Sequence, residues 1–110
     1  MYMYYCDVQS RASMELHKGV SSKTFWGDNM LLSLVEFEPG SKGAPHNHPH
    51  EQVGVILEGE IELTIGEDNK LLQPGDCYVI PGGVEHSAAT SGTFCKMVIV
   101  FSPVREDYKY

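Results

Sequence analysis

The chain has 110 residues, a formal net charge of −7 and 42% hydrophobic residues. A chain of this length builds one core, and its hydrophobic content is enough to fill that core, so a second domain and general disorder are excluded. Its eight basic residues are scattered, and no apolar run reaches the roughly 20 residues that cross a bilayer, so neither nucleic acid nor a membrane is expected as a partner.

The three cysteines, Cys6, Cys77 and Cys95, lie at long spacings without a C-x-x-C pair. This odd number favours reduced thiols that serve as packing residues in a reducing compartment. Residues 1–10 contain tyrosines but no basic stretch followed by an apolar core, so they do not resemble a secretory signal. We therefore expect a cytoplasmic location.

Short strand patterns, separated by Gly and Pro, predominate along the chain. Residues 1–28 are expected to form an N-terminal arm with strands, in which residues 12–18 could form one helical turn. The main barrel is expected over residues 29–102, followed by a tail at 103–110. Its expected strands are 31–37, 53–57, 61–65, 77–80 and 94–101, with a turn at 66–69. Many short strands in so small a chain predict a single all-β domain, either a barrel or a sandwich.

The residues most indicative of chemistry are histidines. His46 and His48 are two positions apart, and on a strand such residues project from the same face. Two neighbouring imidazoles can chelate a metal ion. The histidine pair belongs to the first of two stretches with regularly placed residues. The first stretch contains Gly40, His46, His48, Gln52 and Gly59, and the second contains Gly75, Pro81, Gly83 and His86.

These two stretches resemble, in order and in spacing, both signature motifs of the cupin superfamily. The resemblance implies a jelly-roll barrel, also called a double-stranded β-helix. It also implies one divalent transition metal, either zinc, nickel, manganese or iron, held by His46, His48, Gln52 and His86. The family has a glutamate at the position of Gln52, and usually an asparagine at the position of Thr90.

Gln52 changes the charge of the expected site. Three neutral imidazoles and a neutral amide leave the ion its full double positive charge, which suits Lewis-acid polarisation of a carbonyl or hydroxyl group. Glu51 is the alternative ligand, but strand alternation places it on the opposite face, so we expect Gln52. His50 is either near the site or solvated, and both interpretations remain open. His17 stands apart from the motifs and is expected to be solvated.

The segments 46–52 and 101–107 narrow the resemblance to small single-domain cupins of pectin degradation, which process 4,5-unsaturated uronates. In that group a phenylalanine and an arginine face the pocket, which implies substrate-facing roles for Phe101 and Arg105. The alternative for Arg105 is a surface ion pair with Glu106 or Asp107. The group also has an aspartate where this chain has Ile99, so the carboxylate that the resemblance implies for proton transfer is missing.

Three functions follow as hypotheses. The first is metal-dependent isomerisation or tautomerisation of a small carboxylated or sugar-derived substrate, as in carbohydrate metabolism. The others are an iron-dependent dioxygenase, which Gln52 disfavours, and a module that binds a small ligand without chemistry.

Val53, Val55 and Leu57 lie opposite Gln52 yet are apolar, as are Val98 and Val100 on the last strand. Strands apolar on both faces are normally covered on both, so a homodimer is expected.

Overall fold

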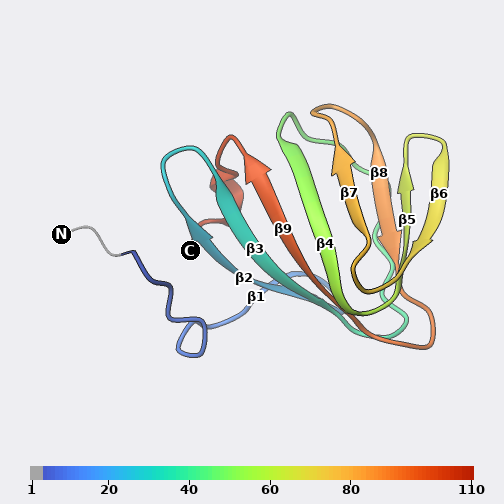
Figure 1. Cartoon of the computed structure of the whole chain (residues 1–110), viewed down its shortest axis with the longest axis horizontal. Helices are drawn as coiled ribbons and strands as arrows, with labels where there is room; N and C mark the ends of the chain where they lie inside the picture. The colour runs from blue at the N-terminus through green and yellow to red at the C-terminus, as the bar shows by residue number, and fades with distance from the viewer. Residues whose placement is uncertain (1–3) are drawn as a thin grey trace.

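Two antiparallel sheets make up the computed structural model, which describes residues 4–110 (Figure 1). The strands are Met14–His17 (β1), Val20–Trp26 (β2), Leu31–Phe37 (β3), Glu51–Gly59 (β4), Ile61–Ile65 (β5), Asp68–Leu72 (β6), Cys77–Ile80 (β7), His86–Ala89 (β8) and Cys95–Ser102 (β9), followed by a 3₁₀ turn at Glu106–Tyr108 (η1). The six-stranded sheet has the order β1-β2-β3-β9-β4-β7, and the three-stranded sheet has the order β6-β5-β8. This all-β arrangement confirms the predicted jelly-roll.

Strand alternation decides which side chains fill the interior. Along β9, Cys95, Met97, Ile99 and Phe101 are buried, and the residues between them are more exposed, as the sequence predicts. β9 lies between β3 and β4, so its inward side chains stand at the centre of the larger sheet. They therefore form the wall of the interior against which the smaller sheet closes.

Two local predictions are wrong. Residues 12–18 do not form a helical turn: residues 14–17 form β1, which pairs with β2 at the edge of the larger sheet. The predicted turn at 66–69 is shorter, because residues 68–72 form β6 and pair with all of β5. Most of β6 is exposed and polar, so its sequence carries little apolar alternation. In both cases, pairing with a neighbouring strand decides the conformation.

The C-terminal tail packs against β2. The hydroxyl group of Thr24 donates a hydrogen bond to the carbonyl oxygen of Tyr108 at 2.6 Å, and that of Tyr110 donates one to Ser22 at 3.2 Å. The guanidinium of Arg11 lies 3.9 Å from the centroid of the Tyr110 ring. These contacts hold η1 and the residue that precedes it, Arg105, at one end of the fold. Within residues 4–110, no helix is long and apolar enough to span a membrane.

The cysteines are free thiols, and Cys95 differs from the others because it is buried between β3 and β4. Burial raises the pKa of the Cys95 thiol to about 11, so almost none of the reactive thiolate is present at mildly alkaline pH. We expect iodoacetamide to modify the exposed Cys6 while sparing Cys95 until denaturant is added. Peptide mass spectrometry measures both rates, and equal rates in the folded protein would contradict this burial.

Candidate metal centre

A short backbone pairing brings two distant histidines together. His46 and His86 form an isolated antiparallel bridge, with backbone hydrogen bonds of 3.0 and 2.9 Å between them. Their ring centroids are 4.4 Å apart. His46 and His48 lie near each other as predicted, with ring centroids 6.0 Å apart, but they do so without a regular strand, because only His46 is bridged and His48 lies in a loop. The loop still turns the His48 ring to within 4.9 Å of the His86 ring, centroid to centroid.

The three histidines form a cluster that could hold a metal ion: one nitrogen from each of them lies within 4.8 Å of the other two. In each ring, Nδ1 contacts a backbone carbonyl oxygen two residues away. These distances are 3.2 Å from His46 to Ala44, 3.1 Å from His48 to His50 and 2.9 Å from His86 to Val84. A neutral imidazole that donates from Nδ1 keeps a lone pair on Nε2, which is the form that binds a metal.

The fit to a cation is clearest at His86. Its Nε2 is buried and has no hydrogen-bond partner among residues 4–110. A buried polar atom without a partner is costly, and a metal ion would supply the missing interaction. Burial is the main cause that lowers the pKa of both His48 and His86, and the positive charge of Arg105 also contributes. Both rings are thereby kept in the neutral form that a metal ion requires.

The amide oxygen of Gln52 lies beside the histidine cluster. Its side chain is buried, and its Oε1 lies 3.2 Å from Nε2 of His48. Its amide nitrogen donates to the hydroxyl oxygen of Tyr78 at 2.9 Å, and that hydroxyl donates to the sulfur of Met97 at 3.7 Å. This chain of hydrogen bonds fixes the amide orientation. When Nδ1 of His48 carries the proton and donates to His50, the lone pairs of His48 Nε2 and Gln52 Oε1 face the same space, and a cation there would bind both. Glu51 is exposed on the opposite face of β4.

Tyr78 is a site residue that the sequence does not reveal. It is accommodated because Gly54 lies beneath its ring: a Cβ on Gly54 would meet ring atoms at 2.6 Å. Burial raises the pKa of Tyr78 to about 12, so its hydroxyl stays protonated and can keep its hydrogen bond to Met97. In the sequence, the glycine at position 54, within the first motif, is the local feature that indicates room for an aromatic ring against this strand.

Changing Tyr78 to Phe is expected to weaken metal binding by about 10-fold, because outer hydrogen bonds that orient a ligand typically contribute this much. The ring remains, so the barrel should keep its thermal stability within about 1.5 kcal/mol. Competition with a chromogenic chelator measures the affinity, and thermal unfolding of the metal-free protein serves as the control. An unchanged affinity would show that Gln52 does not need this hydrogen bond.

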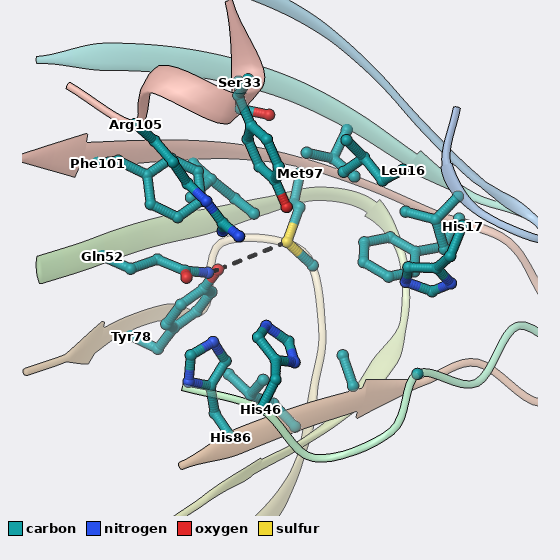
Figure 2. A pocket seen from close by; sticks show the side chains of 18 residues that line it. Leu16, His17, Ser33, His46, Gln52, Tyr78, His86, Met97, Phe101 and Arg105 are labelled. Carbon is teal, nitrogen blue, oxygen red and sulfur yellow. Dashed lines mark hydrogen bonds between the residues drawn. The ribbon is translucent and has the colours of Figure 1, made fainter. Parts of the chain in front are cut away.

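Arg105 both lines the pocket and forms an ion pair, which are the two alternatives that the sequence leaves open for it. Its Nε donates to Oδ1 of Asp107 at 3.1 Å, yet its side chain is only 13% exposed and lines the central pocket. The guanidinium carbon lies 3.9 Å from the Tyr108 ring centroid and 5.2 Å from that of Phe101. Figure 2 shows Arg105 reaching toward the space above Gln52 and Tyr78. The ion pair and the two rings therefore hold the guanidinium over the pocket.

The pocket has a volume of about 250 Å³ and opens beside the histidines. Phe101 and Ile99 are buried in its wall, as strand alternation predicts. His17 is exposed, as expected, and it also lines the far end of this pocket (Figure 2). His50 is half-buried with its ring 5.5 Å from the His48 ring, and its carbonyl oxygen orients His48.

The model of the Cupin domain family matches residues 33–102 of this chain. The chain is a cupin. The "Pectin degradation protein KdgF" of Dickeya dadantii (strain 3937) is 29% identical over 96 residues, which cover 86% of this chain and 87% of that relative. The narrower resemblance seen in the motifs is thereby confirmed.

Other similarities show how widely this cupin fold is used. The solved structure of KdgF from Halomonas sp. superposes with a TM-score of 0.86 at 26% identity, covering 93% of this cupin and 96% of that chain. An RmlC-like cupin from Shewanella frigidimarina gives a TM-score of 0.91 at 25% identity, covering 98% and 97%. The HTH-type transcriptional regulator PuuR of Escherichia coli (strain K12) is 33% identical over 92 residues, which cover 78% of this chain but 50% of the regulator.

Proposed function

We propose that this cupin holds one divalent first-row transition metal ion through His46, His48, Gln52 and His86. The observation that carries the proposal is the buried, unpartnered Nε2 of His86, which faces the other two imidazoles. Three imidazoles and an amide oxygen suit zinc, nickel, manganese or iron(II). The similarity to the KdgF proteins supports a shared pocket architecture.

The proposed activity is isomerisation or tautomerisation of a small carboxylated or sugar-derived compound. A metal ion with four neutral ligands keeps its full charge and would polarise a carbonyl or hydroxyl oxygen of the substrate. Arg105 would bind a carboxylate through its two terminal nitrogens, since Asp107 already engages Nε. Phe101 lies below the guanidinium and would exclude water from that ion pair. Pectin degradation by the KdgF relative supports a sugar-derived acid.

One observation favours a second candidate, which is ligand binding without chemistry. Ile99 occupies the position of the aspartate in pectin-degradation cupins, and it is 7% exposed. The wall of the pocket contains no aspartate or glutamate among the described residues. A proton transfer would then depend on a group other than a carboxylate. For this reason we expect slow or no turnover of 4,5-unsaturated uronates.

The enzymatic proposal is tested by enolisation of pyruvate, the simplest compound that carries a carboxylate beside a carbonyl group. In D₂O, the metal-loaded protein is expected to speed exchange of the methyl hydrogens, measured by proton NMR, beyond the rate with free metal. EDTA should abolish the effect. Arg105→Lys should lower the rate at least about 100-fold, because an ammonium group lacks the planar fork that pairs with both carboxylate oxygens. Bound pyruvate without exchange would support the binding-only candidate.

A further inference from the structure

The charge of the pocket indicates an anionic occupant. Arg105 brings one positive charge, and its side chain lines the same pocket as His46 and His86. Asp107 pairs with Nε of Arg105, but its side chain is 61% exposed and does not line the pocket, and no other carboxylate is among the described residues that line it. A divalent ion at the proposed site raises the positive charge further. An anion bound here would therefore be stabilised at low dielectric.

Most of the remaining wall is apolar. Figure 2 shows His46, Gln52, Tyr78, His86 and Arg105 gathered at one end, with Leu16 and His17 at the other and Met97 between them. Six apolar side chains line the same pocket and are called here the chamber: Val35, Phe37, Leu63, Ala88, Met97 and Ile99. This arrangement provides a polar head site joined to a hydrophobic chamber.

Of the three hydroxyl groups that line the pocket, those of Ser33, Tyr78 and Tyr108, the first two already have partners. The hydroxyl of Ser33 is hydrogen-bonded to that of Ser22 at 2.5 Å. The hydroxyl of Tyr78 is engaged by Gln52 and Met97. A polyhydroxylated sugar placed here would lose its hydration without gaining enough hydrogen bonds in return, which is unfavourable.

The size of the chamber limits the occupant to one ring or a branched chain. The pocket volume is about 250 Å³. A protein cavity of roughly 150 Å³ lined by aliphatic and aromatic side chains holds benzene. The present pocket therefore has room for a ring of that size and for an acidic head group beside the histidines.

We infer that the ligand of this cupin is a small 2-oxo acid with an aromatic or branched aliphatic side chain. Its carboxylate pairs with Arg105, its oxo group faces the histidine cluster, and its side chain fills the chamber formed by the six apolar residues named above. The inference rests on the proposed function for the head group. It adds the identity of the side chain, which separates this protein from cupins that act on hydrated sugars.

Isothermal titration of zinc-loaded protein tests the inference with three probes: benzoylformate, pyruvate and galacturonate. Benzoylformate and pyruvate share the 2-oxo acid head group and differ in the side chain. We expect benzoylformate to bind about 30-fold more tightly than pyruvate, because burying a few ring carbons contributes this much. Galacturonate should bind more weakly than benzoylformate. Equal affinities for benzoylformate and pyruvate, or tighter binding of galacturonate, would overturn the inference.

Ala88→Leu supplies the matched variant. Ala88 lines the chamber on β8, two positions from His86, and a larger side chain there would occupy the space of the ring. The variant should lose at least about 10-fold in benzoylformate affinity but keep its pyruvate affinity and its metal content. If Ala88→Leu is misfolded by circular dichroism, Ala88→Val gives a smaller effect in the same direction. Equal losses for both acids would overturn the chamber assignment.

The two proposals fail in different ways. Absence of metal, or binding of pyruvate that does not need Arg105, contradicts the proposed function. Normal metal content with Arg105-dependent binding of pyruvate, but no gain from the aromatic ring, contradicts only the side-chain inference. Because metal content is measured by elemental analysis, this distinction does not depend on an enzymatic assay.

Discussion

The His86→Ala variant is expected to lose bound metal almost completely, with an affinity at least about 100-fold below that of the unchanged protein. The reason is that Nε2 of His86 is the buried, unpartnered nitrogen at the centre of the cluster. His46→Ala should have a similar effect, because the two rings are adjacent. Elemental analysis of protein reloaded with zinc and then dialysed measures the result, with one equivalent expected for the unchanged chain.

Two neighbouring residues on β4 provide the internal control. Gln52→Ala should weaken the binding of metal while the barrel still folds, because only a neutral amide ligand is removed. Glu51→Ala should leave metal content unchanged, because this side chain is exposed on the opposite face of the strand. If Glu51→Ala releases the metal and Gln52→Ala does not, the ligand assignment is wrong. The argument from the full charge of the ion would then be wrong as well.

The second large effect concerns assembly, where Val98→Glu is expected to convert a homodimer into a monomer. The outer face of the larger sheet exposes Val79 and Leu57, at 58% and 53%. Val98 lies beside Val55 on this face, between β3 and β4. A two-fold dimer would cover these side chains with the same patch of a second copy. A buried glutamate in that interface would carry an uncompensated charge, which strongly opposes association.

The alternative is a monomer whose first residues cover this face. Lys23 does bind the carbonyl oxygen of Val8 at 2.8 Å, so part of the arm lies along β2. However, Tyr4 and Tyr5 are 80% and 92% exposed, and the first described residues, from Tyr4 on, extend away from the sheets (Figure 1). Tyr2 lies outside the described residues. Coverage by the arm is therefore partial, which supports the expectation of a dimer.

Light scattering distinguishes the two states, since the monomer has a mass of 12.2 kDa. We expect about twice this mass for the unchanged chain and the monomer mass for Val98→Glu, with metal content retained. Leu71→Glu is the matched control: this leucine is 49% exposed but lies on β6 of the smaller sheet, so the dimer should persist. A monomer mass for the unchanged chain at micromolar concentration would exclude the dimer.

The sequence by itself predicted β3, β5 and β7 with their observed bounds, β4 and β9 with bounds that differ by one or two residues, and the faces of β4 and β9. It could do so because alternation of apolar residues is a local pattern that follows directly from strand geometry. Gln52 and Ile99 were assigned to the interior by this rule alone, and both are buried. The spacing of the histidine motifs likewise predicted the cupin family, because each motif lies within one short stretch of chain.

Only the tertiary structure decided what depends on pairing between distant segments. Edge strands β1 and β6 form because β2 and β5 supply their hydrogen bonds, although their own sequences carry little pattern. The bridge between His46 and His86, the hydrogen bond from Gln52 to Tyr78 and the place of His17 in the pocket all join residues that are far apart in the sequence. Such contacts arise when the two sheets close, so no local periodicity encodes them.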